Sequence, residues 1–309
     1  MMTTKAASNN LLGYGLYLVA ALLWGFNGTV SKILMETKID PARLSQLRVT
    51  LAWLVLFVVI AIINRKALRF NSMQEFKLIA MYGVLGVTMT QWLYFVAINL
   101  LPVGVALIIE FTSPLMVAVW VKFVWNHHVP RFTWVGLAIA IFGLFLVTQV
   151  WQGFTLNPIG LISGFGAAAA LSLYFLTGEK ILHLDKPRDS LSLTMWGFFF
   201  ATVFWAIFKP WWQFPWEYLQ GNSNVNGFLA PHFILVIWMV ILGTVIPFWL
   251  ALAAMKYISS QQASATGMTE PIFASIIAYV VMSENLTIWQ IIGGAITLSG
   301  IAVGENARR

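Results

Sequence analysis

The feature that most constrains this chain is a series of apolar runs, each about twenty residues long, separated by short polar connections. A helix that crosses a membrane needs about 20 mostly apolar residues. Ten such runs are present, at residues 12–34, 43–64, 76–98, 102–124, 131–149, 158–181, 190–208, 233–254, 260–282 and 287–305. Charged residues make up only 9% of the chain, against about 25% in a soluble domain. The sequence therefore predicts an all-α integral membrane protein with ten transmembrane helices and the lipid bilayer as its solvent.

The basic residues predict how the chain is oriented. If the N-terminus lies inside, 13 of the 18 Lys and Arg residues fall on the inner side and 5 on the outer side. Cytoplasmic connections carry the excess of Lys and Arg, so both termini of this multi-pass chain are expected in the cytoplasm. The first run, 12–34, is too long for a signal peptide and is expected to stay as a helix. The net charge of +7 does not indicate nucleic-acid binding, because the basic residues lie mostly between the apolar runs, where they orient the protein in the membrane.

The longest polar connection, residues 209–232, is then expected outside the membrane. It contains Trp211, Trp212, Trp216 and Tyr218. Aromatic side chains gather at the interface between lipid and water, which is the simpler interpretation of this stretch. A lid that gates substrate entry is the alternative.

Several function classes lack their motifs. The chain has no Cys, which excludes disulfides and thiolate chemistry. His127 and His128 are adjacent, and neighbouring residues on a helix point in different directions, so no metal site is expected. We find no zinc-protease motif, phosphate loop or cofactor fingerprint, and we expect neither a cofactor nor enzymatic activity. An intramembrane enzyme, a channel and a scaffold remain the rival classes.

The chain repeats itself at a separation of 157 residues. The matched pairs include Trp92 with Trp249, Thr112 with Thr269, Pro114 with Pro271, Gly136 with Gly293, and Gly143 with Gly300. Smaller offsets, of 145 and 148 residues, pair Gly15 with Gly160 and Lys32 with Lys180. Matching prolines and glycines in one ungapped register make chance an unlikely source of the pattern.

The repeat predicts two units of five helices, residues 1–152 and 153–309. An odd number of helices places the second unit upside down relative to the first. Inverted repeats are the architecture of many secondary transporters, in which the two units rock about a central site near the middle of the membrane. The sequence therefore favours a carrier that works by alternating access around a central cavity.

Particular motifs resemble the EamA family of the drug/metabolite transporter superfamily over nearly the whole chain. The stretches 20–27, 269–274 and 290–300 follow the family pattern, and Arg48 lies where that family often has an Arg. Two positions depart from it, because Asn126-His127-His128 replaces a usual Gly-Glu and Ser283 replaces a Gly. The resemblance implies ten helices, a central cavity, and export or exchange of amino acids or related metabolites. We expect a bacterial cytoplasmic (inner) membrane location, as a monomer or homodimer.

Two carboxylates fall well inside the predicted spans, Glu110 and Glu270. A charge at this depth is costly and usually faces a cavity or a partner. Glu270 directly precedes Pro271, and Glu110 lies four residues before Pro114. A proline inside a helix removes a backbone hydrogen bond, so both acids are expected beside helix irregularities. Each could bind a substrate ammonium group or exchange protons, or could instead make a structural contact, for example with Arg48.

Arg48 could attract a substrate carboxylate or could reach outward to the membrane surface. Further polar and aromatic side chains could line a cavity, although in membrane helices such groups also hold helices together or contact lipid. These candidates are Asn27, Gln91, Thr112, Gln262, Thr269, Trp24, Tyr94 and Trp249. An amino acid would use Glu270 and Arg48 together, whereas an organic cation would need the acids and aromatic residues alone. A nucleoside-type metabolite is the third possibility within the carriers.

Overall fold

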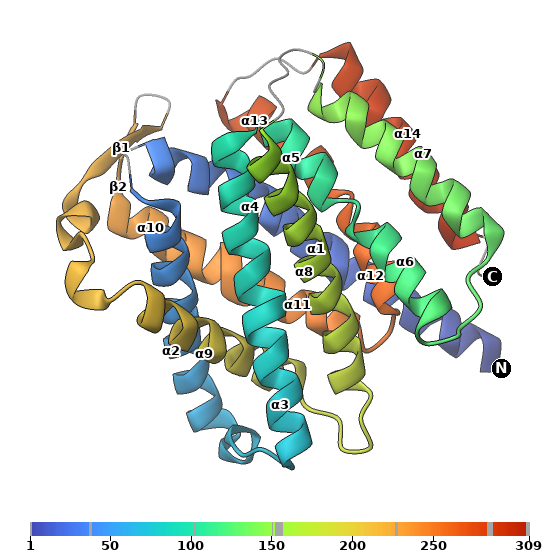
Figure 1. The fold of residues 1–309 in the computed structure, drawn as a ribbon, viewed down its shortest axis with the longest axis horizontal. Coiled ribbons are helices and arrows are strands. Elements are labelled where there is room, and N and C mark those ends of the chain that lie inside the picture. Colours follow the sequence, from blue (N-terminus) through green and yellow to red (C-terminus); the bar gives the residue numbers. More distant parts are fainter. Residues whose placement is uncertain are drawn as a thin grey trace.

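The computed structural model describes residues 2–36, 39–101, 103–149, 151, 157–225, 228–282 and 287–306. Helices packed in a bundle make up nearly all of this structure, with one small hairpin at its edge (Figure 1). Eight of the described helical stretches are long and apolar enough to cross a membrane, and Ile288–Gly304 forms a shorter apolar helix. The chain is therefore an all-α membrane protein, as predicted. The predicted span 260–282 is divided between two helices, and the number of ten stays a prediction.

The first half of the chain runs from α1 to α7. Its elements are α1 (Met2–Glu36), α2 (Pro41–Ile63), the 3-10 turn η1 (Arg65–Leu68), α3 (Met73–Met81), the π-helical segment η2 (Tyr82–Thr88), α4 (Met89–Leu100), α5 (Val103–Glu110), α6 (Ser113–Phe123) and α7 (Arg131–Thr148). The stretch α3–η2–α4 is one continuous helix with a wider central turn, and it contains the predicted third span.

The second half runs from α8 to α14. Its elements are α8 (Pro158–Leu182), α9 (Ser190–Phe208), η4 (Trp211–Gln213), η5 (Trp216–Gln220), β1 (Asn222–Val225), β2 (Phe228–Pro231), α10 (His232–Val240), η6 (Ile241–Val245), α11 (Ile246–Ala254), α12 (Ser260–Gly267), α13 (Glu270–Met282) and α14 (Ile288–Asn306). Strands β1 and β2 pair antiparallel, with Asn222 opposite Pro231. Ser283, one of the two departures from the family pattern, lies outside the described residues.

The second helix of each half begins at an aspartate. The carboxylate of Asp40 accepts a hydrogen bond from the backbone N–H of Ala42, and Asp189 accepts one from Leu191. Such caps satisfy N–H groups that have no partner inside the helix. The caps define where α2 and α9 start, and thereby the depth of every residue along them.

Both halves interrupt one helix at equivalent positions. Helix α5 ends at Glu110 and α6 begins at Ser113, while α12 ends at Gly267 and α13 begins at Glu270. Each of these helix ends in the first half lies 157 residues before the corresponding helix end in the second half. The hydroxyl of Thr112 donates to the carbonyl of Ile109 (2.6 Å), and that of Thr269 donates to Thr266 (2.8 Å). The two threonines thus satisfy carbonyl groups at the interruptions, just before Pro114 and Pro271.

Both halves also contain a π-helical segment. The last residue of η2, Thr88, and the last residue of η6, Val245, lie 157 residues apart. The hydroxyl of Thr88 donates to the carbonyl of Gly83 (2.9 Å), and Thr244 donates to Met239 (2.8 Å). Each bond spans five residues, which matches the wider turn of a π-helix. π-Bulges are frequent at functional sites, and one of these threonines also holds Arg48, as described below.

Helices α7 and α14, the last described helix of each half, lie side by side along one edge of the bundle (Figure 1). Glycines bring their backbones together. A Cβ atom placed on Gly136 would lie 2.5 Å from the carbonyl oxygen of Gly300, and one on Gly293 would lie 2.6 Å from that of Gly143. Such distances leave no room for a side chain, so the close contact of the two helices depends on glycine at these positions.

Candidate functional site

Arg48 lies on α2, is only 9% exposed, and faces the second half of the chain. Its Nε donates a hydrogen bond to the hydroxyl of Thr244 in η6 (2.7 Å), and its guanidinium lies 5.9 Å from the ring centre of Phe248. Thr244 is itself held by the carbonyl of Met239. Within the described part of the chain, the two terminal amino groups of Arg48 donate to no residue. They remain available to a planar anion such as a carboxylate.

The two acids come from the two interrupted helices. Glu110 is the last residue of α5 and Glu270 is the first residue of α13. Both side chains are partly buried, and they lie near enough to interact electrostatically. Glu270 also interacts electrostatically with Arg48, although their charged atoms are not within 4.0 Å of each other. Among the described residues, neither carboxylate accepts a hydrogen bond.

Aromatic side chains surround these charges. Trp24 of α1 packs edge-on against Phe248, with ring centres 5.1 Å apart, and against Tyr17 at 6.2 Å. Tyr94 of α4 interacts electrostatically with both acids. Helix α1 reaches the start of α13 because its Gly25 has no side chain: a Cβ there would lie 3.1 Å from the carbonyl oxygen of Glu270. The structure thus brings Trp24, Tyr94, Arg48 and both acids to one region of the bundle.

Two predicted polar residues have buried atoms without partners. Gln91 accepts a hydrogen bond from the hydroxyl of Ser45 (2.9 Å), but its Nε2 is buried and donates to none of the described residues. The Oδ1 of Asn27 is likewise buried and unpartnered within the described chain. An unsatisfied buried polar atom costs about 1–3 kcal/mol, so each position favours a polar ligand atom or a water molecule nearby.

Other predicted residues have contacts that account for them structurally. Thr112 and Thr269 bond backbone carbonyls at the helix interruptions, beside Pro114 and Pro271. Gln262 caps α12 together with Ser259 and donates to the hydroxyl of Tyr14 (2.6 Å). The side chain of Trp249 is 38% exposed. The structure therefore does not bring all of the predicted residues together.

Sequence reasoning missed Thr244, which accepts a hydrogen bond from Arg48, and Phe248, whose ring lies near its guanidinium. The repeat drew attention to Trp249, because its counterpart is Trp92, whereas the neighbouring Phe248 is the residue that lies beside Arg48. Arg48 itself has no basic counterpart: it is the eighth residue of α2, and the eighth residue of α9 is Gly197. The helix interruptions and π-helical segments follow the repeat, but the basic residue at position 48 does not.

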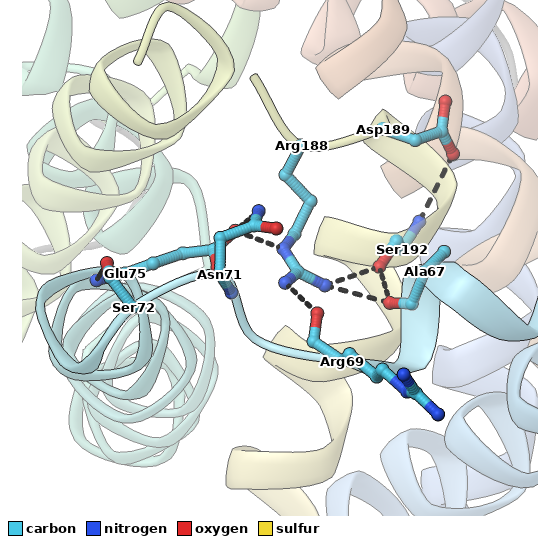
Figure 2. A network of polar contacts seen from close by, with 8 residues as sticks. All are labelled: Ala67, Arg69, Asn71, Ser72, Glu75, Arg188, Asp189 and Ser192. Carbon is cyan, nitrogen blue, oxygen red and sulfur yellow. Dashed lines mark hydrogen bonds and ion pairs between the residues drawn. The ribbon is translucent and has the colours of Figure 1, made fainter. Parts of the chain in front are cut away.

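A second polar cluster lies where the connection after α2 meets the start of α9 (Figure 2). Arg188 and Glu75 are 5% and 3% exposed, and their charged atoms are 2.6 Å apart. Arg188 also donates to the carbonyls of Ala67 (2.9 Å) and Arg69 (2.7 Å) and to the hydroxyl of Ser192 (2.8 Å). The cluster joins α3, the start of α9 and the connection that follows α2, which contains η1, at one rim of the bundle.

The opposite end of α2 contacts the connection that follows α9. Arg43 donates to the carbonyl of Pro210 (2.9 Å) and Gln46 donates to that of Lys209 (2.6 Å). The ammonium of Lys209 pairs with Asp40 at 2.7 Å. Partial burial raises the pKa of the Asp40 carboxyl, but hydrogen bonds from Lys209 and from the N–H of Ala42 outweigh it, and the pKa is lowered below its usual value. Each rim of the α2–α9 pair is therefore fastened by polar contacts.

The described residues of the connection 209–232 pack against one another and against α1. Trp211 stacks on Trp216 with ring centres 5.9 Å apart, and the hydroxyl of Tyr218 donates to the carbonyl of Leu34 in α1 (2.8 Å). His232 contacts the carbonyl of Tyr218 (2.7 Å) and the hydroxyl of Ser223 (3.0 Å). These contacts attach the connection to α1 at the rim of Asp40. The gating interpretation stays a prediction.

Comparisons with known proteins agree with this architecture. Residues 11–149 and 158–303 match the model of the EamA-like transporter family. The threonine/homoserine exporter RhtA of Escherichia coli K12 is 26% identical over 266 residues, covering 85% of this chain and 81% of the exporter. The uncharacterized transporter YdfC of Bacillus subtilis is 21% identical, covering 76% of this chain and 72% of its own. A solved crystal structure has the same fold, with a TM-score of 0.76, 17% identity and 98% coverage of both chains.

Proposed function

Because the chain belongs to the EamA-like transporter family and is a multi-pass membrane protein, we propose that it is a secondary transporter that exports or exchanges an amino acid or a related zwitterionic metabolite. The family membership supports transport across a membrane. The substrate class rests on the charged groups of the site. The name of the relative RhtA, a threonine/homoserine exporter, points in the same direction.

The observation that carries this proposal is the pair formed by Arg48 and Glu270. Their opposite charges interact but are not joined in an ion pair, and each keeps bonding capacity that no described residue uses. An amino acid carries a carboxylate and an ammonium group a few bonds apart. Arg48 would bind the carboxylate and Glu270 the ammonium group, while Trp24 and Tyr94 wall the site. A cation over an aromatic face gains further attraction.

The mechanism that fits this site is alternating access. The halves 1–152 and 153–309 would be inverted repeats, and their interruptions beside Glu110 and Glu270 would lie near the middle of the membrane. Glu110 interacts electrostatically with Glu270 and pairs with no basic side chain of the described residues, and we assign it to proton exchange during the cycle. The matched positions of both interruptions and both π-helical segments support two units of related structure. The location would be the bacterial inner membrane, with both termini in the cytoplasm.

Counterflow in proteoliposomes tests the substrate class. Vesicles loaded with unlabelled threonine should accumulate labelled threonine through the wild-type protein. Arg48→Gln and Glu270→Gln should each lower this flux about tenfold or more, because the loss of one charged contact weakens binding by roughly 1.4 kcal/mol or more. Flux measured from pH 5.5 to 8.5 should change with pH in the wild type and lose part of that dependence in Glu110→Gln.

Arg65→Gln and Glu217→Gln are the matched controls, since both side chains are exposed and lie away from the site. Full threonine flux through folded Arg48→Gln and Glu270→Gln would overturn the assignment.

An organic-cation carrier is the alternative that the aromatic walls allow. Such a carrier would take up 1-amino-2-propanol, which lacks the carboxylate, and Arg48→Gln would leave its flux unchanged.

A further inference from the structure

An apolar groove of about 460 Å³ lies between α7 and the α5–α6 segment. One wall is formed by α7, from Trp134 to Phe145, and the other by Ile108 and Leu115. The lining is open to the outside of the bundle: Phe142 is 56% exposed. In a membrane this face meets lipid, and the groove is separate from the residues assigned above to substrate binding.

Two cations lie at one end of the groove. The ammonium of Lys122 is 5.5 Å from the ring centre of Trp134, one of the lining residues. Arg131 is the first residue of α7 and precedes Trp134 by three residues, which places both on one side of the helix. Both cations are exposed, and neither pairs with a carboxylate of the described chain within 4.0 Å. This end of the groove is therefore positively charged and free to bind an anion.

The length of the groove matches half a bilayer. Trp134 and Phe145 are eleven residues apart on α7, which corresponds to about 16 Å along the helix at a rise of about 1.5 Å per residue. One leaflet of the hydrocarbon core is about 15 Å thick, half of the total. A chain that starts at the charged end and runs along the groove would therefore cross one leaflet.

The equivalent surface of the second half lacks these features. At a separation of 157 residues, Tyr279 and Ile288 replace Lys122 and Arg131, and Ser299 and Ala302 replace Phe142 and Phe145. The two surfaces share an exposed alanine at the centre, Ala138 in the groove and Ala295 in the second half. The charged end and the aromatic wall thus belong to one half only.

We propose that this groove binds one phospholipid with an anionic headgroup. Its phosphate lies at Lys122 and Arg131, and one acyl chain lies along α7 between Trp134 and Phe145. The charge of the two cations selects the headgroup, because each basic residue near a membrane surface favours anionic lipid. The apolar walls hold the chain. Ile108 lies in α5, two residues before Glu110, so the lipid packs behind the segment that carries this acid.

Native mass spectrometry of the purified full-length protein tests the proposal. The protein is stripped of lipid in detergent and titrated with phosphatidylglycerol or with phosphatidylethanolamine. The wild type should bind a first phosphatidylglycerol more tightly than phosphatidylethanolamine. Lys122→Gln and Arg131→Gln should each weaken the first phosphatidylglycerol about fivefold and leave phosphatidylethanolamine unchanged. Ala138→Trp, which fills the groove, should abolish the first binding step.

Ala295→Trp is the matched control on the second half and should bind lipid as the wild type does. Gel filtration and circular dichroism identify any variant that fails to fold. If Ala138→Trp fails to fold, Lys122→Gln and Arg131→Gln still test the proposal, because both replace exposed side chains. Equal affinity of the wild type for both lipids would overturn the proposal, as would equal binding by Ala138→Trp and Ala295→Trp. Loss of a dimer in Ala138→Trp, with lipid binding unchanged, would assign the groove to a second copy of the chain instead.

Discussion

At the scale of single residues, Arg188 is the most completely bonded charge in the described structure outside the candidate site. Its guanidinium contacts Glu75, two backbone carbonyls and the hydroxyl of Ser192, and lies 5.2 Å from the ring centre of Phe70. A buried charge depends on such partners, because removing one member of a buried pair leaves the other without compensation. The cluster therefore stabilises the bundle only while both charges are present.

We expect Arg188→Leu to lower the midpoint of thermal unfolding in detergent markedly, at a cost of about 3–5 kcal/mol, because the charge of Glu75 is left buried. The double variant Arg188→Leu/Glu75→Leu should recover part of this loss, since it removes both charges. The exposed pair of Lys256 and Asp189, 3.4 Å apart, is the control. Lys256→Gln should change stability by less than about 1 kcal/mol. Equal destabilisation by Arg188→Leu and Lys256→Gln would contradict this view of the cluster.

The residues of the candidate site could be predicted only in part. Glu110, Glu270 and Arg48 stand out in the sequence because charges are rare inside apolar runs, and the structure brings them together. Thr244 and Phe248 are ordinary residues in a membrane helix, and their contact with Arg48 depends on how α2 meets η6. No local pattern carries this information. The roles of the three charged residues stay predictions until transport is measured.

At the scale of helices, the apolar runs predict where most helices lie, but their internal irregularities are harder to foresee. Pro114 and Pro271 indicate the interruptions before α6 and α13. Segments η2 and η6 carry no such signal, since the hydroxyls of Thr88 and Thr244 donate to carbonyls five residues back, and threonine is also common in regular membrane helices. The hairpin of β1 and β2 was also not predicted, because residues 209–232 have the composition of an irregular connection.

The contact between α7 and α14 gives a prediction at this scale. We expect Gly143→Ala to lower the thermal midpoint, because the new Cβ would lie 2.5 Å from the backbone nitrogen of Thr297 and would force the helices apart. Overpacking of this kind costs about 1–3 kcal/mol. Gly15→Ala is the control, because nothing lies within 4 Å of its added Cβ. That variant should be neutral or stabilising, as alanine favours helix by about 1 kcal/mol over glycine. If the two variants unfold at the same temperature, glycine is not required between α7 and α14.

At the scale of the whole molecule, the proposed orientation can be tested directly, since the chain has no natural Cys. Single cysteines are introduced at two exposed positions, Lys186→Cys before α9 and Gln220→Cys after η5. A membrane-impermeant maleimide applied to intact cells should label Gln220→Cys and should reach Lys186→Cys only after lysis. The distribution of basic residues predicts this result. The reverse labelling pattern would show that the termini lie outside.

The pairing of α7 with α14 has a consequence for how the protein is made. The two helices are about 157 residues apart in the chain, and synthesis proceeds from the N-terminus at about 5–20 residues per second. Helix α7 is therefore in the bilayer for roughly ten seconds or longer before α14 can cover its glycine face. A ribosome that stalls before α14 leaves that face exposed, where cellular quality control could recognise the incomplete chain.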